Sequence, residues 1–247
     1  MQKRVVLVTG GMGGLGESIC LKLADLGYIV VTTYSPSNKT ADAWVAGMRE
    51  RGYHFHAHPV DVSDPEDCAR MAAKVVAEVG QVDVLVNNAG ITRDMTFKKM
   101  TKVDWDAVIN TNLNSVFNMT KPFIDGMVDR GWGRVINVSS VNGQKGAFGQ
   151  TNYAAAKAGM HGFTKALALE VARKGVTVNT VSPGYTRTDQ VAGVLSDPVK
   201  AKMLADSTLL KRLGEPDDIG DFVRALSGGA GRWVTGQLIE VSGGFRV

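Results

Sequence analysis

Short runs of branched apolar residues alternate along the chain with longer segments in which apolar residues recur every three or four positions. The runs are nearly continuous in Val, Ile and Leu, which is typical of parallel strands buried on both faces. Seven runs predict strands: Arg4–Thr9, Tyr28–Tyr34, Phe55–Val60, Val82–Asn87, Arg134–Ser139, Val176–Val181 and Leu238–Val241. The segments between them predict helices, among them Gly14–Leu26, Pro65–Glu78, Trp105–Asp129 and Tyr153–Arg173.

This alternation predicts an α/β fold: a single Rossmann-type, doubly wound domain over residues 1–247, with a seven-stranded parallel sheet flanked by helices. The length suits one undivided domain of this class, and 44% hydrophobic residues are ample for its core. One excursion, at about 184–215, breaks the rhythm before a helix near Pro216. Long excursions are usually functional, so we interpret this one, with its helical stretch Pro198–Ala205, as a lid; a passive surface insertion is the alternative.

Tyr153 and Lys157 stand one helical turn apart, so their side chains leave the same helix face. An ammonium held near a phenol favours the phenolate and therefore lowers the phenol pKa, which is ordinarily about 10. A tyrosine tuned in this way can exchange a proton with a substrate oxygen near neutral pH. The spacing alone is weak, because most Tyr-x-x-x-Lys pairs are simply surface neighbours.

A glycine-rich segment, Thr9–Gly16, follows the first predicted strand and opens the first predicted helix. Gly10, Gly14 and Gly16 permit a tight turn, a close backbone approach to a pyrophosphate and close helix packing. The helix N-terminus then offers free N–H groups to phosphates. Together with the Tyr153 pair, this segment predicts hydride chemistry on a carbonyl or alcohol with a phosphate-bearing cofactor.

The motifs and their order resemble the short-chain dehydrogenase/reductase superfamily over essentially the whole chain. The matching residues are Thr9–Gly16, Asn87–Gly90, Asn112, Ser140, Tyr153 with Lys157, and Pro183-Gly184. The resemblance implies that Tyr153 gives its proton to the ketone oxygen and that Ser140 hydrogen-bonds the same oxygen. It implies that Lys157 lowers the tyrosine pKa and binds the nicotinamide ribose, while Asn112 holds a water of a proton relay.

The same resemblance implies a set of cofactor-binding residues that follow four of the predicted strands or lie in the helix that begins at Tyr153. The set is Gly10, Met12, Gly13, Gly14, Leu15, Gly16, Asp61, Val62, Asn88, Ala89, Gly90, Tyr153, Lys157, Pro183, Gly184 and Thr188.

The end of the second predicted strand bears on the choice of cofactor. A carboxylate there would accept hydrogen bonds from a ribose 2′-hydroxyl and repel a 2′-phosphate. This chain has no acid there before Asp42, and it offers Ser35, Ser37, Asn38 and Lys39, which can receive a phosphate. NADP(H) is therefore favoured over NAD(H), although many NADP-using relatives carry an arginine where this chain has glycine, at position 13.

Within the superfamily, the run Trp132–Tyr153 and the segment Ile91–Asp94 resemble acetoacetyl-CoA reductases of polyhydroxybutyrate synthesis, which form (R)-3-hydroxybutyryl-CoA with NADPH. The implied substrate residues are Asp94, Ser140, Phe148, Gln150, Tyr153, Gly184 and Tyr185. One alternative is a 3-oxoacyl-[acyl-carrier-protein] reductase of fatty-acid synthesis. A second, of a different class, is a non-catalytic NADP(H)-sensing or scaffold protein. The presence of all four catalytic residues, Asn112, Ser140, Tyr153 and Lys157, argues against it.

The net charge of +4 is scattered, apart from Arg93, Lys98, Lys99 and Lys102. This group is either a solvated face or a surface that attracts an anionic substrate carrier. A nucleic-acid partner would need a basic stripe, so none is expected. No apolar run is long enough for a membrane span, so no membrane partner is expected. Because the chain also shows no signal-peptide pattern and no disulfide framework, a reducing cytoplasm is the expected location.

Other residues add little chemistry. The spacing of Cys20 and Cys68 fits neither a disulfide framework nor a metal site. His54, His56 and His58 alternate along one strand face, but nothing nearby completes a metal site, so we expect no metal. Small residues fill the helix around Tyr153, which favours close packing of that helix; the resemblance implies that a partner subunit packs there, in a homotetramer.

Overall fold

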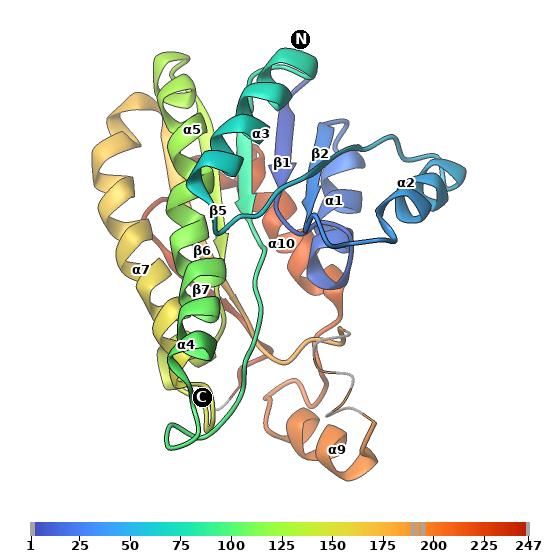
Figure 1. Ribbon diagram of the computed structural model, residues 1–247, viewed down its shortest axis with the longest axis vertical. Coiled ribbons are helices and arrows are strands. Elements are labelled where there is room, and N and C mark those ends of the chain that lie inside the picture. Colours follow the sequence, from blue (N-terminus) through green and yellow to red (C-terminus); the bar gives the residue numbers. More distant parts are fainter. Residues whose placement is uncertain (1–2, 189–190, 192, 194–195, 246–247) are drawn as a thin grey trace.

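The computed structural model describes residues 3–188, 191, 193 and 196–245. All the strands it describes form one parallel sheet in the order β3-β2-β1-β4-β5-β6-β7 (Figure 1). The strands are β1 Val5–Val8, β2 Ile29–Tyr34, β3 His56–Pro59, β4 Val84–Asn87, β5 Gly133–Val138, β6 Val176–Pro183 and β7 Leu238–Val241. The expected seven-stranded, doubly wound sheet is therefore confirmed, and each strand overlaps its predicted range.

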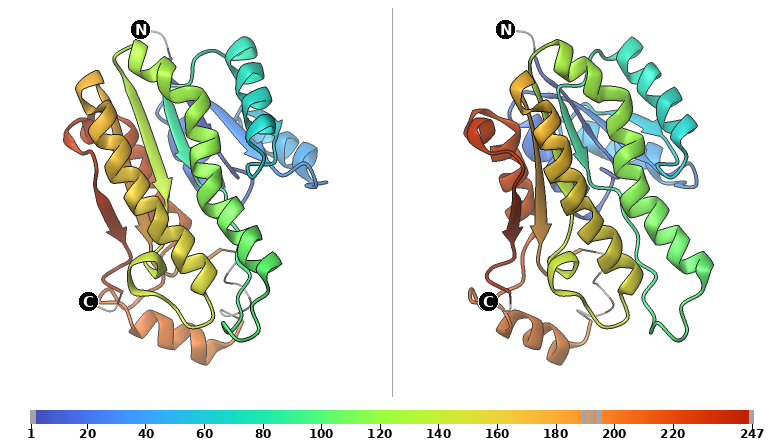
Figure 2. Two further views of the ribbon diagram at one scale, coloured as in Figure 1. Left: turned by 60° about the vertical axis from the view of Figure 1, so that its left-hand side comes forward. Right: turned by 90° about the vertical axis from the view of Figure 1, so that its left-hand side faces the viewer.

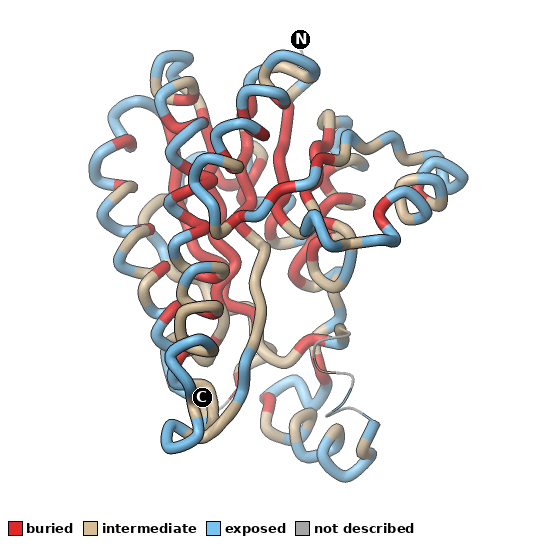
Figure 3. The backbone as a smooth tube through the Cα atoms, in the orientation of Figure 1, coloured by how far each residue is buried: buried red, intermediate tan, exposed pale blue. Residues whose placement is uncertain are grey.

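Two helical layers cover the sheet (Figure 2). The helices are α1 Gly14–Ala24, α2 Ala41–Glu50, α3 Pro65–Glu78, α4 Lys102–Ile109, α5 Ser115–Asp129, α6 Asn142–Lys145, α7 Thr151–Val171, α9 Pro198–Asp206 and α10 Pro216–Ser227. On one face, α3, α5 and α7 contribute to a core cluster that includes the alternate β1 residues Val5 and Leu7. On the other face, α1 and α10 contribute to a cluster that includes Val6 and Val8. Both faces of the central strands are thus buried, as the continuous apolar runs predict (Figure 3).

Local sequence signals set several helix starts. Asp64 accepts hydrogen bonds from the backbone N–H groups of Glu66 and Asp67, and Pro65 occupies the first turn of α3. Asp197 and Pro198 begin α9 in the same way. Such caps satisfy N–H groups that have no partner inside the helix.

The predicted helix Trp105–Asp129 is not continuous. Between α4 and α5 the backbone forms a π-helical segment, Asn110–Asn114, in the middle of which lies Asn112. Such a segment re-aims the side chains it carries and is frequent at functional sites. Periodicity could not reveal it, because the apolar pattern runs on through it.

The excursion between β6 and α10 is fixed to the body at several points. Thr186 forms a bridge with Gly214, and Thr208 with Phe245. Arg187 Nε lies 3.0 Å from a carboxylate oxygen of Glu215. The predicted helical stretch is present as α9, which lies beyond the carboxyl ends of the strands (Figure 2). Part of the predicted lid lies outside the described residues, so its opening and closing stay a prediction.

No helix among the described residues is both long enough and apolar enough to cross a membrane.

Candidate active site

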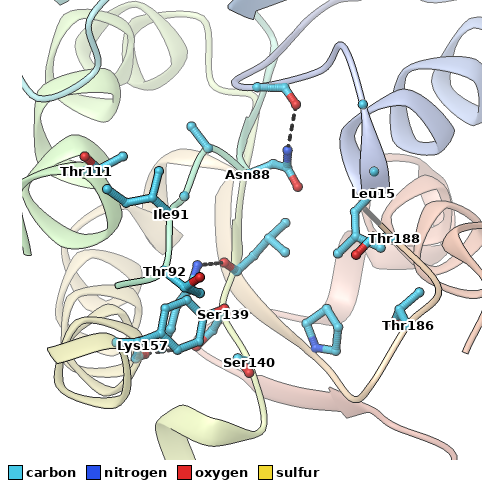
Figure 4. Close-up of a pocket in the computed structure, with 18 of the residues that line it drawn as sticks. Leu15, Asn88, Ile91, Thr92, Thr111, Ser139, Ser140, Lys157, Thr186 and Thr188 are labelled. Atoms are coloured by element: carbon cyan, nitrogen blue, oxygen red, sulfur yellow. Dashed lines mark hydrogen bonds between the residues drawn. The ribbon is translucent and has the colours of Figure 1, made fainter. Parts of the chain in front are cut away.

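A cleft of about 690 Å³ opens where the strands end at their carboxyl side. Figure 4 shows Lys157, Ser139 and Ser140 on one side of it and Leu15 and Thr188 on the other. The predicted residues that line it are Gly10, Gly13, Gly14, Leu15, Ser35, Asp61, Val62, Asn88, Ala89, Gly90, Asp94, Ser140, Gln150, Tyr153, Lys157, Pro183, Gly184, Tyr185 and Thr188. The strand order thus brings together motifs far apart in sequence at the crevice where such sheets bind ligands.

The cleft also has lining residues that the motifs do not specify. They include Thr33, Tyr34, Val60, Ile91, Thr92, Thr111, Val138, Ser139, Val141, Asn142, Thr186 and Val191. Many of them directly precede or follow a motif residue at the end of a strand. Their position at a strand end is therefore the feature of the sequence that could have identified them. Predicted residues outside the lining are Met12, Gly16, Ser37, Asn38, Lys39, Asn112 and Phe148.

The glycine turn is built without space for side chains at two positions. A Cβ on Gly11 would lie 2.1 Å from Thr32 Oγ1, and one on Gly16 would lie 2.2 Å from the Gly10 carbonyl oxygen. Gly10 has a positive φ of 64°, which also favours glycine. At Gly13 the backbone is extended and nothing lies within 4 Å of an added Cβ. Gly11 and Gly16 therefore shape the turn, whereas Gly13 only faces the cleft.

Hydrogen bonds tie the glycine turn to the segment after β4. The Thr9 hydroxyl oxygen accepts from the backbone N–H groups of Asn88 and Ala89, both at 2.9 Å. The Asn88 side chain donates to the carbonyl oxygens of Thr9 at 3.0 Å and Gly10 at 3.1 Å. The two motifs are thus one rigid support for whatever the α1 N-terminus binds.

This geometry gives the first prediction. Gly16→Ala should destabilise the protein by about 1–3 kcal/mol, because the added methyl group collides with backbone that cannot move freely. It should also weaken nucleotide binding, since the turn must shift. Gly13→Ala is the matched control and should unfold at the same temperature as wild type in a calorimetric scan. Equal thermal stability of the two variants would contradict this account of the turn.

Tyr153 and Ser140 both line the cleft, and their side chains interact there. Burial is the largest influence on the phenol and raises the pKa of Tyr153 to about 12, although the interaction with Ser140 acts in the opposite direction. Tyr153 therefore keeps its proton at neutral pH. A protonated phenol beside a cleft is placed to donate to a substrate oxygen.

Lys157 lies behind the tyrosine, only 3% exposed. Its Nζ donates a 2.8 Å hydrogen bond to the Val138 carbonyl oxygen and lies 5.5 Å from the Tyr153 ring centroid. Burial lowers the pKa of Lys157 to about 8. The expectation that Lys157 lowers the pKa of Tyr153 is therefore wrong, because burial is the largest influence on the pKa of both side chains.

Asn112 lies behind the cleft wall, fully buried. Its Oδ1 accepts from the Ile91 N–H at 2.8 Å, and its Nδ2 donates to the Ile91 carbonyl at 2.9 Å. A Cβ on Gly90 would lie 3.3 Å from Asn112 Oδ1 and 3.5 Å from Lys157 Nζ, so the two side chains converge on the same spot. The described contacts make Asn112 a clamp on the segment after β4, and its water-holding role stays a prediction.

Two of the predicted substrate residues, Asp94 and Gln150, belong to one chain of hydrogen bonds. Gln150 donates to an Asp94 carboxylate oxygen at 2.7 Å and accepts from Asn142 Nδ2 at 2.9 Å. The Asn142 backbone N–H in turn donates to Ser140 Oγ at 3.1 Å. Asp94 and Gln150 are thus connected to the catalytic serine through Asn142, a residue that motif reasoning missed.

Phe148 does not line the cleft. Its side chain is 94% exposed, because it lies on the loop between α6 and α7, flanked by Gly146 and Gly149, both with positive φ. Tyr185 does line the cleft and packs edge-on against Phe245, with ring centroids 5.3 Å apart.

The residues predicted to receive a 2′-phosphate follow β2 directly. Ser35 lines the cleft, and its Oγ lies 2.8 Å from Ser37 Oγ. Asn38 Oδ1 accepts from the Thr40 backbone N–H at 2.8 Å, and Lys39 is exposed. Ser35 is therefore the residue of this set that bounds the described cleft.

Neither metal nor thiol chemistry gains support. Among the described residues, no group of three or more His, Cys, Asp or Glu side chains could hold a metal ion. Cys20 and Cys68 are buried and free, and burial raises the pKa of each thiol to about 12, so both stay protonated.

Comparison with known proteins places this geometry in a family. Residues 4–198 match the family described as short chain dehydrogenase. The chain belongs to this family.

Two relatives and one solved structure show how far the similarity extends. This short chain dehydrogenase is 52% identical to an "Acetoacetyl-CoA reductase" of Cupriavidus necator, with both chains covered completely. It is 42% identical to a "3-oxoacyl-[acyl-carrier-protein] reductase FabG" of Staphylococcus aureus, over 97% of this chain and 96% of the relative. The solved structure titled "Crystal structure of gox2181" is 28% identical and superposes with a TM-score of 0.93, covering 99% of this chain and 96% of that one.

Short chain dehydrogenases use a nicotinamide dinucleotide, and the residues present fit one. The glycine turn leaves open backbone at the α1 N-terminus, where phosphates are favoured. Asp61 and Val62 line the adenine end predicted from the motifs, and Lys157 and Gly184 line the opposite end. When bound, the nicotinamide supplies or accepts the hydride.

Proposed function

We propose that this short chain dehydrogenase reduces acetoacetyl-CoA to (R)-3-hydroxybutyryl-CoA with NADPH. The observation that carries the proposal is the placement of Tyr153, Ser140 and Lys157 together in the cleft of a chain that is 52% identical to an acetoacetyl-CoA reductase. In this proposal the Tyr153 hydroxyl gives its proton to the ketone oxygen. Ser140 hydrogen-bonds that oxygen and stabilises the negative charge that develops on it.

Lys157 replaces the proton that Tyr153 gives up. Its pKa of about 8 leaves it mostly charged at neutral pH, yet ready to release a proton inside a buried site. Lys157 Nζ lies 5.5 Å from the centre of the Tyr153 ring, which places the ammonium beside the tyrosine. Asn112, which converges with Lys157 on Gly90, is the next proposed member of the relay, through a water.

The preference for NADPH is the second part of the proposal. Ser35, which bounds the cleft after β2, carries no charge to repel a 2′-phosphate. We expect wild type to show a higher kcat/KM with NADPH than with NADH. Ser35→Asp should reverse that order, because a carboxylate there repels the phosphate and accepts the ribose hydroxyl. Ser35→Asn is the uncharged control. A wild-type enzyme that prefers NADH would contradict the role given to the β2 end.

The choice between CoA and a carrier protein decides the physiological role. We expect acetoacetyl-CoA to be reduced with a higher kcat/KM than the same acetoacetyl group on acyl carrier protein, and short chains to be preferred over long ones. Both carriers are anionic, so salt dependence cannot distinguish them. Steady-state kinetics on the two thioesters, at one ionic strength, measure the ratio. An advantage for the carrier-protein thioester would assign the chain to fatty-acid synthesis.

The assay also tests the non-catalytic alternative. A sensor or scaffold protein would bind NADPH but show no thioester-dependent NADPH oxidation. The Tyr153–Ser140–Lys157 cluster argues for turnover, since binding alone needs no proton donor.

We further propose a cytoplasmic homotetramer whose CoA thioester product serves polyhydroxybutyrate synthesis. Exposed apolar side chains on the helices α4, α5 and α7, namely Val103, Phe117 and Leu169, support association of subunits through this helical face. Light scattering on the purified protein measures the number of subunits.

A further inference from the structure

Helix α7 presents three side chains, each one turn from the next, toward the end of β5. They are Tyr153, Lys157 and His161. The Tyr153 side chain interacts with Ser140, and Lys157 donates to the Val138 carbonyl oxygen. The third contact joins His161 Nε2 to Ser139 Oγ at 3.0 Å. Each of the consecutive residues 138, 139 and 140 is thus contacted by a side chain from a different turn of α7.

The Ser139 hydroxyl also contacts the helix backbone. Ser139 Oγ lies 2.9 Å from the Lys157 carbonyl oxygen and is buried. A carbonyl oxygen can only accept, so the single hydroxyl proton of Ser139 is committed to Lys157. His161 must therefore donate to Ser139 through Nε2–H. This order of donors fixes the histidine tautomer.

We propose that His161 is a positioning residue that, through Ser139, holds the Lys157 backbone in register with Ser140. The inference rests on the proposed reductase function for its kinetic consequence. His161 Nε2–H orients the Ser139 hydroxyl, and that hydroxyl anchors the turn of α7 between the two catalytic side chains. The anchor sets the relative position of Tyr153, Lys157 and Ser140 before substrate arrives. None of its contacts involves the reacting oxygen, so His161 itself takes no part in proton transfer.

The surroundings of His161 keep the donor order stable. Half-burial is the largest influence that lowers the pKa of His161, followed by the positive charges of Lys165 and Lys157. The imidazole is therefore neutral at assay pH, and a neutral ring with its proton on Nε2 satisfies the serine. The opposite tautomer would leave two acceptors facing each other at 3.0 Å.

Two variants of His161 separate positioning from bulk packing. His161→Gln keeps an N–H donor at a similar reach, whereas His161→Leu removes the donor and keeps an apolar side chain. Loss of the anchor should lower kcat about ten- to a hundredfold, since small displacements of catalytic groups have effects of that size. We expect His161→Gln to retain kcat within about threefold of wild type. The alkaline limb of the kcat–pH profile should move in His161→Leu and not in His161→Gln.

The pair Ser139→Ala and His161→Leu tests whether the two residues act together. If His161 acts through Ser139, the double variant should be no slower than Ser139→Ala alone. Multiplying losses, or a His161→Leu enzyme within twofold of wild type, would overturn the proposal.

A measurement without turnover keeps this inference separate from the proposed function. Long-range ¹H–¹⁵N NMR spectra of wild type, assigned with His161→Gln, should show His161 as the neutral Nε2–H tautomer. An Nδ1–H tautomer would overturn the anchor whatever the substrate is. An Nε2–H tautomer in a protein that does not reduce acetoacetyl-CoA would instead refute the function and leave the anchor standing.

Discussion

Replacing Tyr153 by phenylalanine should lower kcat for thioester reduction by about 10²–10⁴-fold, the usual contribution of a general acid. The phenyl ring can occupy the same buried position, so folding and NADPH binding should persist. With a pKa of about 12 the Tyr153 phenol is protonated at pH 7, so the substitution removes a proton donor that wild type holds in the cleft. Stopped-flow reduction under single-turnover conditions measures the chemical step directly.

Tyr28→Phe is a matched control for this experiment. The Tyr28 hydroxyl contacts the Ser227 carbonyl oxygen, away from the cleft lining, so its removal should leave kcat unchanged. NADPH titration of both variants checks that the cofactor still binds. If Tyr153→Phe kept activity within about threefold of wild type, Tyr153 would not be the proton donor.

Replacing Lys157 by methionine should impair both turnover and cofactor binding, because the ammonium is proposed to supply the proton relay and to bind the nicotinamide ribose. We expect kcat to fall about 10²-fold or more and the NADPH Kd to rise. In wild type, reduction should decline as pH rises through about 8, where Lys157 loses its charge. Unchanged NADPH affinity in Lys157→Met would contradict the dual role.

The same variant should not be less stable than wild type at pH 7. Burial lowers the Lys157 pKa from 10.5 to about 8, so the unfolded chain binds the proton more tightly than the folded one. The resulting cost to folding is about 3 kcal/mol below pH 8 and disappears as pH rises toward 10.5. Methionine avoids that cost and loses one hydrogen bond, worth about 1 kcal/mol.

Urea unfolding of the cofactor-free protein at pH 7 measures this balance. Lys174→Met serves as the control, because Lys174 is exposed in the short 3-10 segment that follows α7. If Lys157→Met unfolded at a much lower urea concentration than Lys174→Met, the Lys157 ammonium would stabilise the folded protein. That result would contradict the folding cost described above.

The sheet was predictable from the sequence because a strand that is buried on both faces is apolar along its whole length. Leu7 or Ile136 is apolar whichever neighbour it meets, so strands that are buried on both faces are readable without knowing their order. The cleft was predictable for a related reason: motif residues such as Asn88 and Gly184 follow strands, and parallel strands end at one edge of the sheet.

What the sequence could not give depends on distances between separate elements. Apolar periodicity continues through Asn112, so the π-helical segment that buries this side chain was invisible. Gly11 stands at an unspecified motif position, and only its closeness to Thr32 shows why it is glycine. The pKa of Tyr153 was predicted in the wrong direction, because the loss of solvent around a side chain cannot be read from residue spacing.

Within the glycine turn, Gly11 and Gly16 have no room for a side chain, whereas Gly13 has open space beside it. Gly13 is therefore the position of this turn that can accept a larger residue. An arginine there would meet no protein atom near its Cβ, and its guanidinium could reach toward a phosphate on the ribose. We therefore expect Gly13→Arg to strengthen the preference for NADPH without a cost to folding. Selection for tighter NADPH binding would be expected to act first at such a position.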